Sequence, residues 1–532
     1  MQTVSESWKN AHRQTLLNES YVEVSLDIAD PDALIDATSS DNGSAYISDT
    51  EEVVSEVNTA IKSYGTLEQN IWLLDGTRKS IPESDYKDGG YVGDVLSNDE
   101  GEFVDKIPTI TINFSQVHTK LIPGLIITWG KAYNEYPEHF IVSAYNGDTL
   151  VVQKEVLDNN SVTTVLTWEV SNYTRIIIQI FSWCLPNHRA RVDEIFMGWH
   201  KVYSKQDLFS YSHEQVVDPI STSLPKMEIK FSVDNRDGSY NPYNLDGMAK
   251  YLTERQEVKT RYGLKLDNGT IEWVEGGVFY LSEWYAKQNG ISADFVARDL
   301  LEFMSATYYD NVSAIGERTL YDLAVSLLQA ANLPSNSDGT NKWVIDESLN
   351  DITTTAVLPN DTIANCLQMI ANMGRCVLYP DRNGNLHIEP ISSNETDYVI
   401  NSFNSYSKSE ITLSKPIKQV AVKVYNYSLG AKGVESTTNT TEIVTVGDVG
   451  EVIVVDNPLV TSTENAIALG EWVGNYLKNR MTLKSSVRAD VRLDALDIVS
   501  NENDYSTNRV RMTNVRFDFN GAFRGSSEGR VI

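Results

Sequence analysis

The chain has 532 residues, of which 41% are hydrophobic and 10% aromatic, so it can form about three to five domains with sizeable cores. Its 44 basic and 73 acidic side chains give a net charge of −29, which argues against binding to nucleic acid or to an anionic membrane surface. Its three cysteines are too few for a disulfide framework and indicate folding in a reducing cytoplasm.

Residues 1–105 carry mixed signals. The N-terminus lacks the apolar core of a signal peptide, and no apolar run in the chain approaches the ~20 residues that span a bilayer, so no membrane anchor is expected. The segment YVEVSLDI at 21–28 alternates apolar and polar residues, which predicts a strand. A Ser48–Glu51 capping box then predicts a helix that ends at Gly65.

Residues 106–199 form an almost continuous β pattern. Segments such as LIITW, HFIVSAYNG and RIIIQIFSW are rich in β-branched and aromatic residues, and turn pairs such as Asn146-Gly147 separate them. About seven short strands with this regular punctuation predict a β-sandwich or a jelly roll.

Residues 200–305 also predict paired strands. The segment MEIKFSV at 227–233 alternates in the way of a half-buried strand, and a second alternating run covers 258–262. The turn-rich segment DNRDGSYNP separates the two runs. Asn289-Gly290 predicts the turn of a further hairpin.

Residues 306–405 mix helices with strands. Thr319 is the predicted N-cap of one helix, and a second helix is expected from about Asp361 to Gly374. The segment CVLYPDRNGNLHIEP then predicts two strands around an Asn-Gly turn.

Residues 406–532 return to β structure. Alternating segments such as KPIKQVAVKVYNYSLG and EVIVVDNP predict strands, and one helix is expected near 463–480. The chain as a whole is therefore predicted to be mainly β with one α+β region.

No motif in the chain meets the requirements of a catalytic or metal site. Gly525–Gly529 matches G-x-S-x-G, but only three residues follow it, which leaves no room for the helix and partners of a nucleophile elbow. Cys184 and His188 have ligand-like spacing without a second pair, and the Asp234–Gly238 turn places Val233 where a calcium loop needs its first ligand. We therefore predict no catalytic residue, no metal ligand, no cofactor and no enzymatic activity.

Four sequence segments match motifs of a known protein family. They are LPKMEIKFSVDNRDGSYNPYNLDGMAKYL from 224, TLEQNIWLLDG from 66, CVLYPDRNGNLHIEP from 376 and VRADVRLDALDIV from 487. Together they resemble the hub proteins of tail tips and baseplates in phages and prophages of Gram-positive bacteria. The segment 106–199, in which RARVDEIFMG follows YTRIIIQIFSW, resembles the galactose-binding-like jelly roll of carbohydrate-binding modules.

The resemblance implies a division of the chain into five parts. These are the N-terminal part of a first hub domain at 1–105, an inserted jelly roll at 106–199, a first hub β-barrel at 200–305, an α+β helix–hairpin domain at 306–405 and a second hub β-barrel at 406–532.

The resemblance also implies a role. Such a hub is a structural protein of the virion, in which a homotrimer with two barrels per chain forms a ring that continues the sixfold tail tube. Its partners would be distal tail, tail tube and other baseplate proteins, and the jelly roll would face outward toward the host surface or a neighbouring tail protein. A lytic role is less favoured, because the long C-terminal extension that carries wall-degrading domains in many relatives is not seen here.

The inserted segment supplies the only ligand hypothesis, which is binding of host cell-wall polysaccharide. Exposed aromatic side chains stack on sugar rings, and polar groups beside them bond the hydroxyls. The turn-rich segments at the predicted sandwich ends contain Tyr133, Asn134, Tyr136, Trp183, Asn187, His188 and Arg189. The alternative reading makes Trp183 a core residue and the others loop residues or contacts to another tail protein, since a fold alone does not determine function.

Overall fold

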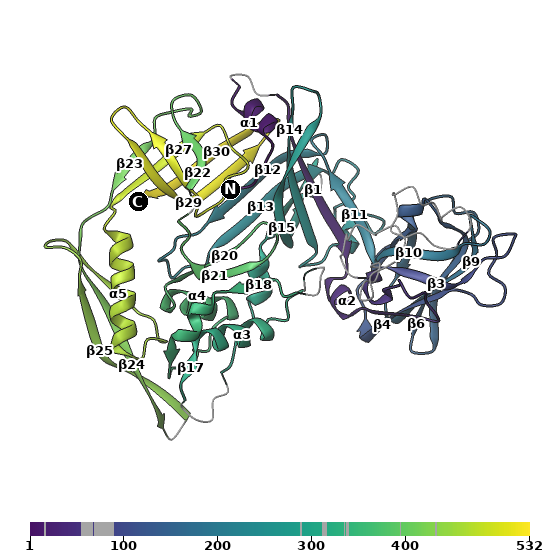
Figure 1. The fold of residues 1–532 in the computed structure, drawn as a ribbon, viewed down its shortest axis with the longest axis horizontal. Helices are drawn as coiled ribbons and strands as arrows, with labels where there is room; N and C mark the ends of the chain where they lie inside the picture. The colour runs from purple at the N-terminus through teal and green to yellow at the C-terminus, as the bar shows by residue number, and fades with distance from the viewer. Residues whose placement is uncertain are drawn as a thin grey trace.

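The computed structural model describes residues 1–14, 18–54, 68, 90–287, 290–310, 316–334, 336, 340–393, 395–430 and 433–532. The protein is mainly β with few helices, as predicted (Figure 1). Over these ranges no helix is long and apolar enough to cross a membrane. Most of the helix predicted up to Gly65 lies outside the described residues; the part that is described forms a short 3-10 helix, η1 (Thr50–Val54).

The main body is built on one 13-stranded sheet. Its path runs β11-β1-β14-β15-β16-β13-β12-β29-β30-β27-β23, and β28 pairs with β29 and β22 off this path. The strands are β1 (Ser20–Ala29), β11 (Gly198–Tyr203), β12 (Leu208–Val216), β13 (Lys226–Asp234), β14 (Glu257–Lys265), β15 (Ile271–Ala286), β16 (Ser292–Arg298), β22 (Glu395–Ile400), β23 (Glu410–Leu413), β27 (Met481–Val487), β28 (Ile498–Glu502), β29 (Thr507–Phe519) and β30 (Phe523–Val531).

The predicted first barrel region and the larger part of the predicted second one lie in this single sheet. We call β1 and β11–β16 the first β module, and β22, β23 and β27–β30 the second β module. They join where β12 pairs antiparallel with β29, from Tyr211 opposite Phe519 to Val216 opposite Asn514. One hydrophobic core runs under both modules; the Phe523 ring lies 5.4 Å from the Tyr262 ring across the junction. The modules therefore share a sheet and a core, in place of two separate closed barrels.

A β-sandwich occupies the segment between β1 and β11. Its sheets have the orders β3-β10-β5-β8 and β2-β4-β9-β6-β7. The strands are β2 (Thr38–Asp41), β3 (Tyr91–Leu96), β4 (Thr109–His118), β5 (Ile122–Trp129), β6 (Pro137–Asn146), β7 (Thr149–Val156), β8 (Thr163–Val170), β9 (Tyr173–Trp183) and β10 (Arg189–Phe196). Two short helices, α2 (Pro31–Asp36) and η2 (Lys131–Tyr133), also belong to this segment.

The sandwich begins earlier in the chain than the predicted boundary at residue 106. β2 pairs with β4 and β3 pairs with β10, so strands from the predicted first hub domain complete both of its sheets. β2 has only four residues, and its partner lies about seventy residues along the chain, so local periodicity could not assign it to the sandwich.

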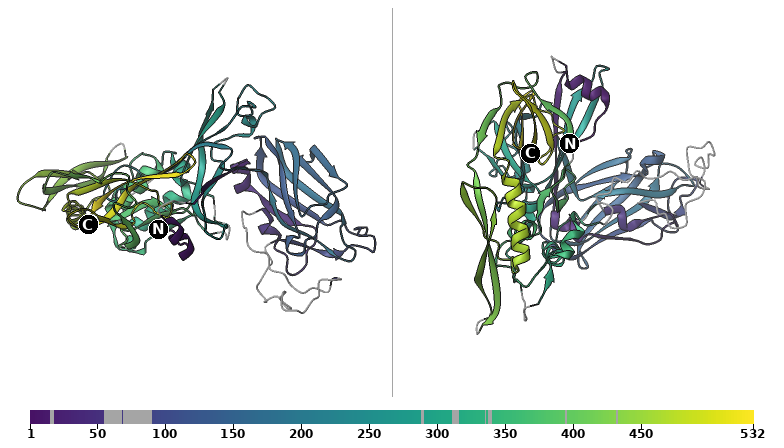
Figure 2. Two further views of the ribbon diagram at one scale, coloured as in Figure 1. Left: turned by 90° about the horizontal axis from the view of Figure 1, so that it is seen from above. Right: turned by 60° about the vertical axis from the view of Figure 1, so that its left-hand side comes forward.

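The sandwich leaves the main sheet between two neighbouring strands and projects to one side (Figures 1 and 2). Ala29, at the end of β1, lies opposite Gly198, at the start of β11. Gly198 has φ +148°, and a Cβ there would lie 2.3 Å from the Ile28 carbonyl oxygen, so this close approach requires glycine. A second contact is made by Lys250, whose Nζ lies 2.9 Å from the Glu169 carboxylate in the sandwich.

The α+β region largely follows its prediction. Helices α3 (Leu320–Ala330) and α4 (Ile363–Met373) are capped by the Thr319 and Thr362 hydroxyls, and α4 ends at Gly374. Strands β20 (Cys376–Pro380) and β21 (Leu386–Pro390) form the expected hairpin, beside β18 (Trp343–Ile345). The remaining elements are α1 (Glu6–His12), η3 (Met248–Tyr251), η4 (Leu300–Met304), η5 (Glu347–Asp351), β17 (Arg318–Thr319) and β19 (Thr353–Thr354).

Part of the predicted second barrel belongs instead to the core of the α+β region. Strands β24 (Ile417–Gly430), β25 (Gly433–Thr445) and β26 (Glu451–Val455) form a separate sheet, and α5 (Thr463–Leu477) packs on one of its faces. Val420 and Val422 of β24 share a hydrophobic cluster with α3 and α4. The alternating pattern predicted these strands correctly but could not show which of the two cores they pack against.

Two glycines bring α5 close to this sheet. A Cβ at Gly470 would lie 2.7 Å from Cγ2 of Val444, and one at Gly474 would lie 2.7 Å from Cγ2 of Val446. We expect Gly470→Leu to lower the free energy of unfolding by about 1–3 kcal/mol through overpacking, although leucine is the better helix former. Urea unfolding checks this, with Glu471→Leu on the exposed side as the control. A Gly470→Leu variant as stable as the wild type would contradict the close packing.

Candidate functional site

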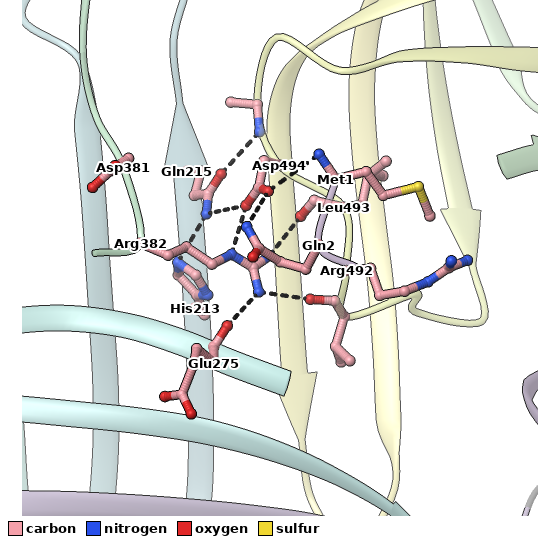
Figure 3. Close-up of polar contacts among 12 residues, drawn as sticks. Met1, Gln2, His213, Gln215, Glu275, Asp381, Arg382, Arg492, Leu493 and Asp494 are labelled. Carbon is pink, nitrogen blue, oxygen red and sulfur yellow. Dashed lines mark hydrogen bonds and ion pairs between the residues drawn. The ribbon is translucent and has the colours of Figure 1, made fainter. Parts of the chain in front are cut away.

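Arg382 connects three parts of the main body at the tip of the β20–β21 hairpin (Figure 3). Its guanidinium donates to the Glu275 carbonyl of β15 at 2.9 Å, and to the carbonyls of Val491 and Leu493 at 2.8 and 2.9 Å. Its Nε lies 2.6 Å from Oδ1 of Asp494. The side chain is only 3% exposed, so one buried cation ties the hairpin to both β modules.

Asp494 gathers further polar groups around this cation. The side-chain amides of Gln2 and Gln215 donate to its carboxylate at 3.0 and 3.2 Å (Figure 3). Burial acts to raise the pKa of Asp494, but the Arg382 charge, the Met1 ammonium at 3.5 Å and these hydrogen bonds outweigh it, so the pKa lies below its usual value. The carboxylate is therefore charged at neutral pH and forms a buried ion pair with Arg382.

A chain of buried aromatic hydrogen bonds continues from this pair into the first β module. Gln215 Nε2 lies 3.4 Å from His213 Nε2, and His213 Nδ1 lies 2.7 Å from the Tyr262 hydroxyl. That hydroxyl lies 2.6 Å from the hydroxyl of Tyr211. Burial, with the nearby Arg382 charge, lowers the pKa of His213 to about 3, so its imidazole is neutral in the folded protein.

The arrangement is suited to holding segments together. A cleft of about 500 Å³ opens beside the network, and its lining mixes charges of both signs, among them Lys9, Lys226, Glu389 and Asp397. Over the described ranges no group of three or more His, Cys, Asp or Glu side chains could hold a metal ion. The buried ion pair and its hydrogen bonds join β12, β15, the hairpin and the Val491–Asp494 loop into one unit.

The predicted sugar-binding residues gather at one end of the sandwich, but two of them face inward. Trp183 is 1% exposed, and its indole donates to Oε2 of Glu135 at 2.9 Å. His188 is 1% exposed as well, with Nδ1 3.0 Å from Oε1 of Glu135. Neither ring offers a face to a ligand, which corrects the sugar-stacking expectation for both and agrees with the core reading of Trp183.

The other predicted residues are partly accessible. Asn134 is exposed in the left-handed conformation at φ 57°, and Tyr136 is half-buried against the sandwich core. Asn187 donates to the Asp99 carboxylate at 3.1 Å, and Arg189 donates to the Gly93 carbonyl at 2.9 Å. This end of the sandwich therefore presents mainly polar groups to solvent.

Arg191 organises this end and was missed by the sequence reasoning. Its guanidinium makes a two-pronged ion pair with Glu68, at 2.7 and 2.9 Å, and lies 4.4 Å from the centre of the Tyr133 ring. Burial acts to raise the pKa of Glu68, but Arg191 outweighs it, so the pKa is lowered. The sequence offers one hint of this ion pair, the Arg-Ala-Arg pattern at 189–191. A charged side chain on a buried strand needs a partner of opposite charge, so the pattern indicates that an acidic residue lies nearby.

Arg191→Lys is expected to destabilise the sandwich by about 1–2 kcal/mol, because a lysine ammonium cannot reproduce the paired contacts of the guanidinium with Glu68. Arg175→Lys is the matched control, since Arg175 lies on β9 of the sandwich and donates to the Gly147 carbonyl at 3.2 Å, so the substitution should cost less than about 1 kcal/mol. Thermal unfolding of both variants measures the difference. Equal effects from the two substitutions would show that the Arg191–Glu68 pair has no special weight.

No protein-family model matches this chain, and no curated protein matches it. Among solved structures it is similar to three tail proteins. The 43 kDa tail protein of prophage MuSo2 from Shewanella oneidensis is 12% identical with a TM-score of 0.41, covering 62% of this chain and 95% of that one. The tail protein from Neisseria meningitidis MC58 is 11% identical with a TM-score of 0.41, covering 63% and 93%. Prophage tail protein gp18 from Listeria monocytogenes EGD-e is 12% identical with a TM-score of 0.39, covering 62% and 91%.

Proposed function

We propose that this chain is a structural hub protein of a phage or phage-like tail tip or baseplate, and that three copies form a ring that continues the tail tube. The observation that carries the proposal is the pairing of β12 with β29, which sets two β modules of one chain side by side in one sheet. This arrangement suits a subunit that supplies two neighbouring positions of a six-membered ring.

The resembling segments support the proposal through their places in the fold. The segment from 224 supplies β13 and η3 in the first module, and the segment from 487 supplies the loop that leads from β27 to β28 in the second module. The segment from 376 forms the hairpin whose Arg382 binds both modules. Two of the phrases that resemble hub proteins, those from 376 and 487, thus meet at the Arg382 junction in the main body, whereas the phrase from 66 lies outside the described residues except for Glu68.

The buried network is suited to holding segments of the chain in place, and we propose that it has no catalytic role. Arg382 and Asp494 neutralise each other at the wall of the cleft, and His213 is held neutral by its surroundings. Each group fixes the relative position of segments from different parts of the chain. We propose a non-enzymatic protein of the virion whose partners are two further copies, the distal tail and tail tube proteins, and other baseplate components.

The sandwich is proposed as the module that touches the host surface or a neighbouring tail protein. It stands to one side of the main sheet and meets the body through the Ala29–Gly198 root and the Lys250–Glu169 contact (Figure 2). Pulldown of the full chain with purified host cell wall tests the polysaccharide option. Binding that is lost in Asn134→Ala and Arg189→Ala variants would place the sugar at the predicted end, and no retention on the wall would leave contact with a tail protein.

Stoichiometry in solution or on particles tests the ring. Mass photometry is expected to show a species at three times the chain mass of 59.6 kDa. A chain that remains monomeric at every accessible concentration, and that is absent from purified tails, would contradict the proposal.

A further inference from the structure

We propose that the outer face of the β24–β26 sheet docks a second copy of this chain. The inference rests on the proposed ring and goes beyond it by naming the surface through which neighbouring copies meet. We call this surface the outer face; its central residues are Ala421, Ile443, Val452 and Val454.

Only one face of this small sheet is covered by the chain's own core. On the covered face, Gly470 and Gly474 of α5 lie against Val444 and Val446, and Val420 and Val422 are fully buried. On the outer face, Ile443 and Val454 are each 59% exposed and Val452 is 51% exposed. In both Figure 1 and Figure 2, no element of the described chain lies over this face.

The exposed side chains lie on either side of Ala421, which is 8% exposed, in a continuous apolar row. Ala421 of the central strand lies opposite Ile443 on β25 and opposite Val454 on β26. Opposed residues in a sheet point to the same side, so these three side chains cross all three strands together. Val452 lies one step along β26 on the same side, which widens the row into a patch.

The charges of the outer face favour a copy of the same chain as its occupant. Any second copy also carries a net charge of −29, so contact between copies requires a surface without surplus acid. At the edge of the patch, Lys423 pairs with Asp456 at 2.5 Å, and these two charges cancel. The patch residues themselves are uncharged, so like-charge repulsion is least here.

A free strand edge lies on the same flank of the molecule. β23 ends the path of the main sheet; among the described residues it pairs with β27 alone, which leaves its other edge open. Its Ile411 and Leu413 are 55% and 62% exposed. Figure 1 places β23 and the β24–β26 sheet on the side opposite the sandwich. An apolar face beside an open edge suits a head-to-tail contact that closes into a ring.

The test places a charge in the patch and the same charge elsewhere. Val454→Asp and Ile443→Asp are each expected to weaken self-association of the full chain at least about tenfold, because each buries an unpaired carboxylate in the contact. Val165→Asp is the matched control: Val165 is also an exposed strand valine, at 60% exposure, but lies on β8 of the sandwich. Mass photometry over a concentration series gives the dissociation constants.

The outcomes separate this inference from the proposed ring. Loss of the trimer in both patch variants, with Val165→Asp unchanged, supports the outer face as the contact. A trimer that survives both substitutions overturns the inference and leaves the ring intact, as does a patch variant that keeps its trimer but loses a tail tube protein. A wild-type chain that never associates overturns the ring and the inference together.

Discussion

Arg382→Met is expected to lower the free energy of unfolding by about 2–4 kcal/mol, because it takes from the half-buried Asp494 carboxylate the nearer of its two cations and leaves only the Met1 ammonium at 3.5 Å. The same substitution removes the donor of three backbone carbonyls, at Glu275, Val491 and Leu493. Urea unfolding of the full chain measures the loss. Hydrogen exchange is expected to rise in the β20–β21 hairpin and in both β modules, since all three meet at this side chain.

Two further variants make this result specific. Arg480→Met is the control, because Arg480 donates only to the Ser414 carbonyl at an exposed position and should cost less than about 1 kcal/mol. The double variant Arg382→Met with Asp494→Leu removes both charges and is expected to recover part of the stability. An Arg382→Met protein within 1 kcal/mol of the wild type would mean that the junction does not hold the modules together.

His213 is expected to make the protein sensitive to acid. Its pKa is about 3 in the folded protein, against about 6.5 for an unperturbed histidine, so the unfolded chain binds the extra proton between these values. The contribution of neutral His213 to the free energy of unfolding is therefore fully present above about pH 6.5. It is lost as the pH falls toward 3, and the total loss is up to about 5 kcal/mol.

Comparison with His213→Gln isolates this contribution from the carboxylates. Between pH 7.5 and pH 4.5, the wild type is expected to lose about 3 kcal/mol more stability than the variant. The variant has a constant cost from its altered contact with Tyr262, which cancels in the difference between the two pH values. Parallel pH dependences of the two proteins would show that His213 has the same pKa in the folded protein as in the unfolded chain, and would contradict its neutral, buried state.

Local pattern predicted elements well wherever one face of an element is buried. The strand at 227–233, the Thr319 cap and the hairpin closed by Asp381–Gly384 all appear where expected. The local pattern could not predict which core or sheet a strand joins, because that depends on a partner strand elsewhere in the chain. The strands of 417–455 alternate regardless of which core they face, and the four-residue β2 becomes part of the sandwich only through β4.

The residues of the candidate site could be predicted from the sequence even less well than the strands. The Asn-Gly turn beside Arg382 is predicted from the sequence, but nothing near Arg382 in the sequence points to Asp494 or to Glu275. In the sandwich, Trp183 and His188 were placed in the right region, and their burial follows from Glu135, which lies about fifty residues earlier in the chain. Contacts between distant segments need the tertiary structure.

Cryo-electron microscopy of the purified full chain tests the central claim most directly. We expect a threefold ring around an open channel in which the first and second β modules alternate, giving six similar positions, with the three sandwiches outside. A particle with no shared channel, or one in which the two modules of each chain face away from the axis, would contradict the account.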